Sequence, residues 1–325
     1  MPFFRGIFNP GVYHGFNQRP PFFEGWYFKL VNADENKRYA IIPGVILGDH
    51  AHSFIQVLDG VAGKTAYYSF PLDAFKASKQ KFEVQIAENY FSSESIYLNL
   101  ENETDSISGS LQFSRVTHWP VSLFSPGVMG WYSWVPYMEC YHGVLSFNHL
   151  ISGDLQISGD IVDFSNGRGY IEKDWGQSFP EAWIWFQTNH FPAGQTCLTA
   201  SIAIIPWLHN SFTGFIVGLW HQNQLYRFAT YTGAKIENLV VKAHSIDWSI
   251  RDSKYQLTMK AQQAPGGQLL GPSKIEMGKR VEETLSAVVK VSLQANNGDR
   301  IFEEEGKYAG LEVNGDVHRL IKSIK

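Results

Sequence analysis

Two acidic side chains, two positions apart and flanked by aromatic ones, lie in residues 170–176, which read Tyr-Ile-Glu-Lys-Asp-Trp-Gly. In a strand, successive side chains point to opposite faces, so Glu172 and Asp174 share one face while Lys173 and Trp175 share the other. Two carboxylates about 7 Å apart interact electrostatically, and in an apolar setting the pKa of one of them rises. A carboxyl group that keeps its proton at neutral pH could serve as a general acid. Asp174 is the first candidate for this acid and Glu172 the second, although a solvent-facing acidic pair fits the same pattern.

A further acidic candidate lies in the aromatic segment 131–142. Here Tyr137, Glu139 and Tyr141 would share one face of a strand. A glutamate between two tyrosines in so apolar a segment is a candidate for a perturbed pKa. Glu139 therefore joins the candidate acids, and Tyr137 could orient a ligand oxygen. A hydrogen-bonded glutamate with a purely structural role is the alternative.

Tryptophans and amides share one face of the segment 183–190. The residues on that face are Trp183, Trp185, Gln187 and Asn189. Two indoles beside two amides resemble the lining of a pocket for a large apolar ligand with a polar head, and indole faces stabilise positive charge. Trp26 and Trp175 complete the set of candidate substrate-binding tryptophans. Ordinary core packing is the alternative for each of them.

The sequence offers no motif for a metal, a nucleotide or another cofactor. His50 and His52 have the i, i+2 spacing that a strand metal site can use, but no third ligand follows at a suitable spacing. The glycine-rich residues 166–169 precede a predicted strand rather than the helix that a phosphate site needs. Cys140 and Cys197 are too few for a cysteine-based zinc site or a disulfide scaffold. We therefore expect neither a metal nor a cofactor.

Strand-like alternation dominates the elements that must position these residues. Turn residues interrupt it at roughly 8–12-residue spacing, giving about seventeen strand candidates, which is typical of antiparallel barrels. Residues 24–28 and 181–185 share the pattern Glu-x-Trp-x-aromatic. The number of strands and this weak repeat predict an all-β fold with almost no helix, divided into two barrel domains at 1–165 and 166–325.

Composition narrows the function classes. The chain of 325 residues carries 27 Lys and Arg against 31 Asp and Glu, a net charge of −4, so we expect no nucleic-acid partner. Aromatic residues make up 15% of the chain, which favours strands and apolar cavities. No secretory signal or membrane-spanning run is evident, so we expect a cytoplasmic protein. The aromatic loop 118–134 is the segment expected to touch a membrane surface transiently.

Four segments together resemble the tocopherol cyclase family in its shorter bacterial form. These segments are residues 19–29, 135–143, 169–180 and 183–191, which include Pro-Pro-Phe-Phe-Glu-Gly-Trp-Tyr, Glu-Lys-Asp-Trp-Gly and Trp-Ile-Trp-Phe-Gln. More distantly, the two Trp-bearing strands are similar to those of double-barrel lipocalin-like proteins that include carotenoid hydratases and cyclases. The resemblance implies two lipocalin-like barrels packed together. It also implies cyclisation of a prenylated hydroquinone to a chromanol, without a redox cofactor.

Three functions fit these observations. The first is a cycloisomerase in which a protonated acid adds its proton to the alkene of a prenyl tail and the phenol oxygen closes the ring. The second is a non-catalytic, lipocalin-like carrier of a quinone or terpenoid, for which Glu172 and Asp174 would both face water. The third is a hydratase or another isoprenoid cyclase on the same scaffold, for which a water-holding cavity would lie near the acid. We expect the first, with a hydrophobic prenylated hydroquinone or a related isoprenoid as the substrate.

Overall fold

The chain folds into two compact units. The computed structural model describes residues 8–123, 125–136, 138–207, 210–274 and 276–324. Unit 1 comprises Met1–Phe179 and Gln268–Arg280, and unit 2 comprises Pro180–Gly267 and Val281–Lys325. The chain therefore enters unit 2 after Phe179, returns to unit 1 for one short segment and then completes unit 2.

Unit 1 is built on a single antiparallel sheet that, over the described residues, has twelve strands. Its path runs β4-β3-β2-β1-β12-β10-β9-β8-β7-β6-β5, with β11 paired to β10. The strands are β1 (Phe22–Val31), β2 (Arg38–Leu47), β3 (His52–Asp59), β4 (Lys64–Phe70), β5 (Phe75–Ala77), β6 (Glu83–Ile86), β7 (Asn89–Ser92), β8 (Ser95–Glu101), β9 (Ser106–Thr117), β10 (Cys140–Ile157), β11 (Asp160–Asp163) and β12 (Arg168–Gly176).

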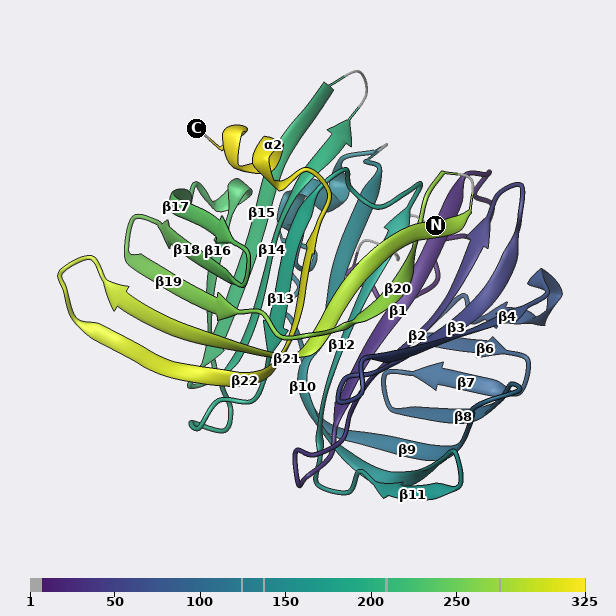
Figure 1. Ribbon diagram of the computed structural model, residues 1–325. Coiled ribbons are helices and arrows are strands. Elements are labelled where there is room, and N and C mark those ends of the chain that lie inside the picture. The colour runs from purple at the N-terminus through teal and green to yellow at the C-terminus, as the bar shows by residue number, and fades with distance from the viewer. Residues whose placement is uncertain (1–7, 124, 137, 208–209, 275, 325) are drawn as a thin grey trace. The chain divides into compact units, whose positions relative to one another are not determined.

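The sheet of unit 1 curls strongly, and β7 to β9 run across the direction of β1 and β12 in Figure 1. The long strand β10 supplies part of this bend, because its register shifts twice between Val144 and His149 where it pairs with β12. Register shifts of this kind bend the strand that contains them and increase the local twist. The curl turns one face of the sheet inward.

The inward face of unit 1 is filled by large apolar side chains. Trp26, Phe28 and Leu30 alternate along β1, which places them on one face of the sheet, and they pack with Phe82, Phe91, Phe113 and Ile171, among others. These side chains form the packed core of unit 1.

Unit 2 contains most of a second antiparallel sheet, in the order β16-β15-β14-β13-β22-β21-β19-β18-β17 with β20 paired to β21. The strands are β13 (Trp183–Thr188), β14 (Cys197–Trp207), β15 (Asn210–His221), β16 (Gln224–Ala229), β17 (Lys235–Lys242), β18 (Ser245–Arg251), β19 (Tyr255–Gln262), β20 (Gly267–Pro272), β21 (Met277–Ala295) and β22 (Arg300–Asn314). Ile184 and Phe186 of β13 join Trp248 of β18 in its core. The segment Gln268–Arg280 belongs to unit 1, although it carries most of β20 and the start of β21.

These two curled antiparallel sheets confirm the predicted all-β fold with two barrel-like units. Within the described ranges, helix is limited to α2 (Val317–Lys322), the turn at Phe8 and three short 3₁₀ segments at Leu72–Ala74, Gly130–Trp134 and Thr230–Thr232. Unit 1 extends past the expected boundary at 165, because β12 (Arg168–Gly176) pairs with β1 and β10 and so belongs to its sheet.

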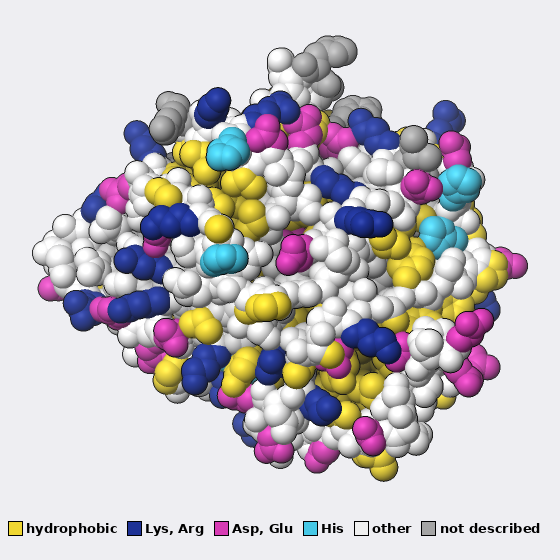
Figure 2. All heavy atoms as spheres, viewed as in Figure 1, with side chains coloured by type: hydrophobic (Ala, Val, Ile, Leu, Met, Phe, Trp, Pro, Cys, Tyr) yellow, Lys and Arg dark blue, Asp and Glu magenta, His cyan; other side chains and the backbone are white. Residues whose placement is uncertain are grey.

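The described residues include no helix that is both long and apolar enough to cross a bilayer. On the face drawn in Figure 2, acidic and basic side chains are interspersed over the surface. This mixture agrees with the small net charge of the chain, −4.

Candidate functional site

A cavity of about 940 Å³ lies in unit 1. Three parts of the chain form its walls: the segment before β1, the loop before β10, and the adjoining ends of β10 and β12. The lining residues include Val12, Tyr13, His14, Phe16, Arg19, Phe22, Val128, Ser133, Met138, Tyr141, His142, Trp175 and Gln177. The wall combines aromatic and aliphatic side chains with polar ones, which include two histidines and the cations Arg19 and Lys79.

Proline and glycine explain why the cavity walls are irregular. The segment before β1 contains Pro10, Gly11 and Gly15, and the loop before β10 contains a Pro-Gly pair at 126–127, so neither can continue a regular strand ladder. At Gly143 of β10, a Cβ atom would lie 3.1 Å from Pro10 and 3.3 Å from Trp175. The absence of a side chain at Gly143 therefore lets the first segment lie directly over the end of the sheet.

Three ionisable side chains meet where β10 and β12 pair. His142 stands opposite Asp174 in the strand register. Its Nδ1 lies 2.9 Å from Asp174 Oδ1, and its Nε2 lies 3.8 Å from Glu172 Oε2. Glu172 is also the acceptor of a 2.5 Å hydrogen bond from the hydroxyl of Tyr170. As strand alternation predicts, Tyr170, Glu172 and Asp174 thus lie on one face of β12.

This cluster holds a positive charge on the imidazole. Burial alone would lower the pKa of His142, but the adjacent Asp174 and Glu172 carboxylates raise it to about 9. His142 is therefore an imidazolium at neutral pH, and it donates a hydrogen bond to Asp174. The three side chains could also each offer one ligand atom to a divalent cation, since these atoms lie within 4.8 Å of one another.

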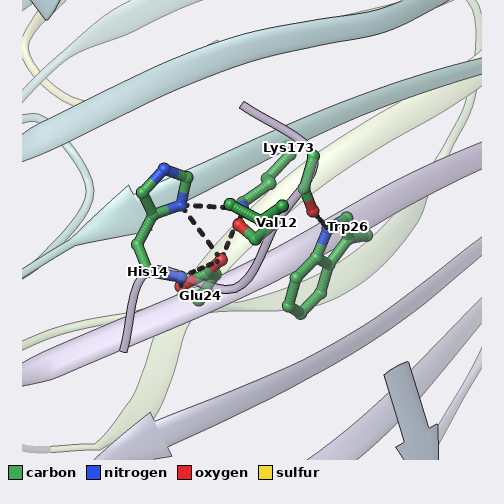
Figure 3. Close-up of polar contacts among 6 residues, drawn as sticks. Val12, His14, Glu24, Trp26 and Lys173 are labelled. Atoms are coloured by element: carbon green, nitrogen blue, oxygen red, sulfur yellow. Dashed lines mark hydrogen bonds and ion pairs between the residues drawn. The ribbon is translucent and has the colours of Figure 1, made fainter. Parts of the chain in front are cut away.

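A second polar cluster lies on the opposite face of β12 (Figure 3). The ammonium of Lys173 is 2.5 Å from Glu24 Oε1, and neither side chain is exposed. Lys173 also donates to the carbonyl of Val12 at 2.5 Å and to His14 Nδ1 at 2.9 Å. Because β1 pairs with β12, Glu24 of β1 reaches Lys173 across the sheet, and the segment before β1 is tied to both strands.

Burial and charge act in opposite directions in this second cluster. Burial lowers the pKa of Lys173 to about 8, although the Glu24 carboxylate favours its charged form. Burial alone would raise the pKa of Glu24, but Lys173 and His14 together hold it below its usual value. At neutral pH the pair is therefore an ion pair buried in the wall of unit 1.

The predicted tryptophans of unit 1 occupy different places. Trp175 lines the cavity and stacks on His14, with ring centroids 4.2 Å apart and planes within 3° of parallel, and also on Tyr141. Trp26 lies instead in the core, where it stacks on Phe82 and donates a hydrogen bond to Gly11. Of these two predicted ligand-contacting indoles, only Trp175 faces the described cavity.

Glu139 makes a separate set of contacts. Its Oε1 accepts a 2.7 Å hydrogen bond from Ser178 and lies 3.0 Å from the ammonium of Lys274. Its side chain is partly buried and hydrogen-bonded, as expected for a glutamate with a purely structural role. Tyr137, the neighbouring candidate, lies outside the described residues.

The remaining candidates belong to unit 2. Trp183 and Trp185 lie on β13, on the face opposite the core residues Ile184 and Phe186, and both are buried. Trp183 donates a 2.6 Å hydrogen bond to Glu312. Gln187 continues this face, and Asn189 follows just after the strand ends; both are fully buried. These four form a group on their own unit and are not among the residues of the described cavity in unit 1.

Sequence reasoning missed the two histidines and the buried ion pair. His142 lies in the aromatic segment 131–142, but only the pairing of β10 with β12 places it beside Asp174. Strand alternation predicts only that Lys173 faces away from Glu172 and Asp174. In the sequence, Glu24 stands out only through the Glu-x-Trp pattern, and no motif contains His14. Lys173, which both residues contact, lies about 150 residues further along the chain.

Comparison with known proteins gives the family. A family model described as tocopherol cyclase-like matches residues 76–315. The chain belongs to the tocopherol cyclase-like family. It is 24% identical to the chloroplastic tocopherol cyclase of Zea mays over 207 residues, which cover 57% of this chain and 41% of that protein. It is 23% identical to a probable chloroplastic tocopherol cyclase of Oryza sativa subsp. japonica, covering 57% and 42%. The matched region thus spans about two-fifths of each plant protein.

Solved structures support the fold assignment. CghA has a TM-score of 0.58 at 10% identity, covering 91% of this chain and 89% of that one. Kievitone hydratase from Nectria haematococca has a TM-score of 0.53 at 11% identity, covering 94% of both chains. At these identities the likeness shows the fold alone. The family supports a cyclase- or isomerase-like role for this chain, and the region that matches it includes His142, Glu172 and Asp174 but begins after His14 and Glu24.

Proposed function

We propose that this protein catalyses the proton-initiated ring closure of a prenylated hydroquinone to a chromanol, in the cavity of unit 1. The observation that carries this proposal is the position of His142. It lines an aromatic cavity and lies beside two carboxylates that keep it protonated. A charged acid on the wall of a pocket that also presents aromatic faces is what such a reaction requires.

The reaction balances without a redox partner. His142 gives its Nε2 or Nδ1 proton to one carbon of the prenyl double bond, and the other carbon becomes electron-deficient. The phenol oxygen forms a C–O bond to that carbon and loses its proton, which returns to the imidazole. The product therefore has the same composition as the substrate, and the enzyme ends in its initial protonation state.

Acid strength sets a constraint on this mechanism. An imidazolium with a pKa of about 9 is a weak acid towards an alkene, so the C–O bond must form as the proton is transferred. Concerted closure requires that the phenol oxygen and the double bond be held together, which is the role of the cavity walls. The ring faces of Trp175 and Tyr141, both in the lining, favour positive charge developing near them.

In this mechanism Asp174 and Glu172 position the protonated His142 and do not donate the proton themselves. Asp174 accepts the hydrogen bond from His142 Nδ1 and so fixes the ring, while Glu172 adds a second negative charge 3.8 Å from Nε2. Neither Glu139 nor Trp26 has a part in this proposal, because their contacts lie elsewhere. Trp183, Trp185, Gln187 and Asn189 belong to unit 2 and have no part in this mechanism, so a role for them in substrate binding stays a prediction.

The test is incubation of the purified protein with a panel of hydroquinones that carry unsaturated prenyl tails. The expected product is a chromanol of unchanged mass in water, with one deuterium on the ring-forming tail in D₂O. We expect His142→Gln to lower turnover by about 100-fold or more, the range seen for loss of a general acid. His244→Gln, which removes an exposed imidazole outside the cavity lining, is the matched control.

Turnover by His142→Gln at the rate of the unaltered protein would contradict the assignment of the acid. The variant Asp174→Asn gives a second, independent readout. Removing this carboxylate lowers the pKa of His142, so the basic limb of the pH–rate profile should move to lower pH. A residue that only maintained the fold would change the rate without moving that limb.

Hydration of the same double bond is a second candidate reaction. Polar side chains, including Asn17, Gln18 and Gln177, line the cavity, and they could hold a water molecule near the acid. The same assay distinguishes the two reactions, because hydration adds the mass of one water to the substrate whereas ring closure adds nothing.

A further inference from the structure

We propose that the cavity of unit 1 takes a ligand that carries a carboxylate, and that Arg19 and Lys79 bind this group at the exposed part of the lining. Both side chains belong to the lining, and both are exposed. The inference rests on the proposed function for the remainder of the ligand, a hydroquinone with an apolar tail. It narrows that substrate class to its acidic members.

The cavity lining contains cations but no carboxylate. Among the described residues that line it, Arg19 and Lys79 are basic, and there is neither an Asp nor a Glu. The composition of the chain does not explain this, because acidic residues outnumber basic ones, 31 against 27. A cavity wall with basic and no acidic side chains attracts anions and disfavours cations.

The two basic side chains differ from the two histidines of the lining. His142 and His14 both have carboxylates of the protein as neighbours, so these rings need no anion from a ligand. Neither Arg19 nor Lys79 takes part in any ion pair found among the described residues. Their charges are therefore available to an anionic group that enters the cavity.

Lys79 lies over an aromatic part of the lining. Its ammonium is 5.5 Å from the centre of the Phe16 ring, within the range of a cation–π interaction. Phe16 contacts Tyr13 edge-to-face, with ring centroids 4.9 Å apart, and Tyr13 contacts Phe22 at 6.3 Å. All three rings line the cavity. The cation thus lies beside apolar ring surface, which suits an acidic group attached to an apolar skeleton.

Arg19 belongs to the same segment as these rings. It follows Phe16 by three positions, a distance along the chain of at most about 10 Å. Because Lys79 lies over Phe16 and both basic side chains are long, their charged ends can approach one ligand group. The planar guanidinium can donate two parallel hydrogen bonds to a carboxylate, and the ammonium adds a point charge.

An anionic lipid surface is the other source of acidic groups. Lipid head groups stay in the bilayer outside the protein, whereas Arg19 and Lys79 are residues of the cavity lining. The structure therefore favours a carboxylate carried by the molecule that enters the cavity. Lipid binding is kept as a separate outcome of the test.

The test measures binding without turnover. The probes are hydroquinones with a saturated tail, which cannot cyclise, that carry a carboxylate on the ring or at the end of the tail, together with the methyl ester of each. Titration calorimetry compares the unaltered protein with Arg19→Gln/Lys79→Gln. Arg115→Gln/Lys37→Gln is the matched control, because it removes the same two types of cation from exposed residues outside the lining.

We expect the unaltered protein to bind at least one carboxylate about tenfold more tightly than its ester, the range of two partly exposed ion pairs together. Arg19→Gln/Lys79→Gln should lose this preference, while the affinity for the ester changes less than about twofold and so shows that the cavity is intact. The preference should also shrink between about 0.01 M and about 1 M salt, because salt screens exposed charges.

Three results would overturn the inference: no probe binds the unaltered protein, no carboxylate is preferred over its ester, or the control variant loses the preference equally. Flotation with vesicles of phosphatidylcholine and phosphatidylglycerol tests the lipid alternative. If Arg19→Gln/Lys79→Gln weakens vesicle binding but keeps the preference for the carboxylate, these cations bind lipid and the inference is wrong. If no hydroquinone is cyclised but the preference depends on these cations, the proposed reaction fails and this inference stands.

Discussion

His142 and His14 show how neighbouring charges decide what one residue type can do. Both imidazoles line the same cavity. The carboxylates of Asp174 and Glu172 raise the pKa of His142 to about 9, so that ring carries a proton at neutral pH. His14 Nδ1 lies 2.9 Å from the ammonium of Lys173 and 3.3 Å from Glu24 Oε1, so a cation and a carboxylate both face that ring.

The raised pKa of His142 makes a prediction about stability and pH. A histidine whose pKa is higher in the folded state, about 9 against a usual 6.5, stabilises the fold fully below pH 6.5 and loses this contribution as the pH rises through 9. We expect the free energy of unfolding of the unaltered protein to fall, relative to His142→Gln, by about 3 kcal/mol over this range. Urea denaturation of both proteins from pH 6 to 10 measures the difference. Parallel curves for the two proteins would contradict the raised pKa.

The buried ion pair makes a second prediction at the residue scale. Lys173→Met removes the ammonium that pairs with the buried Glu24 and leaves that carboxylate only its contacts with His14, so we expect it to lower the free energy of unfolding by about 3–5 kcal/mol. Glu24→Gln/Lys173→Met removes both charges and should recover a large part of that loss. Chemical denaturation of the two variants measures the comparison. A double variant less stable than Lys173→Met would show that the charges themselves stabilise the fold.

At the scale of elements, β12 organises both polar clusters. Its alternation sends Glu172 and Asp174 to one face and Lys173 to the other. Pairing with β10 brings His142 to the first face, and pairing with β1 brings Glu24 to the second. A one-residue slip in either register would exchange the faces and separate both sets of partners. The central position of β12 in the sheet therefore determines the chemistry of the site.

The loop between β9 and β10 is the second element with a functional role. Residues 117–138 contain no Asp, Glu, Lys or Arg. Val121, Leu123 and Trp131 are respectively 45%, 62% and 49% exposed, while other residues of the same loop, such as Val128, line the cavity. We propose that this loop contacts a bilayer in which an apolar substrate is dissolved.

This proposal predicts the behaviour of one double variant. Leu123→Ser/Trp131→Ser should reduce binding to phosphatidylcholine vesicles by about tenfold, because it removes the most exposed apolar surface of the loop. Flotation of protein with vesicles measures the effect. Ile161→Ser, which alters a 75% exposed residue on β11, is the control. Equal losses in the control, or no loss in the double variant, would contradict contact through this loop.

At the scale of the whole molecule, the chain returns to unit 1 after most of unit 2 has been formed. Within unit 1, the amide of Gln56 bonds the backbone of Leu270 twice, donating to its carbonyl and accepting from its N–H, both at 2.8 Å. Phe179 N–H donates to the carbonyl of Pro272, and Lys274 pairs with Glu139. Unit 1 is thus completed by the segment Gln268–Arg280, which is distant in sequence.

This return predicts a long-range effect of Gln56. Gln56→Ala removes both hydrogen bonds from the backbone of Leu270, so we expect a loss of about 1–3 kcal/mol in the free energy of unfolding. Gln85→Ala, which removes one hydrogen bond on an exposed strand residue, should cost less than about 0.5 kcal/mol. Denaturant titration compares the two variants. Equal effects would show that the returning segment adds little to the stability of unit 1.

The fold was predictable from local sequence because strand alternation is a local property. Trp26, Phe28 and Leu30 alternate along β1 and all enter the core, as their spacing predicts. The boundary between units was harder to predict. The assignment of β12 to unit 1 depends on pairing with β1, whose residues lie about 150 positions earlier in the chain.

The sequence by itself determined the all-β architecture, the family and the side chains that share each face of β12, because periodicity, composition and motif are all written along the chain. Only the tertiary structure decided which of these side chains are neighbours. It gave Asp174 its partner His142, gave Lys173 its partners Glu24 and His14, and placed Trp26 in the core but Trp175 at the cavity. The physical reason is that electrostatic and hydrogen-bonding interactions act over a few ångströms in space, and strand pairing brings together residues that are far apart along the sequence.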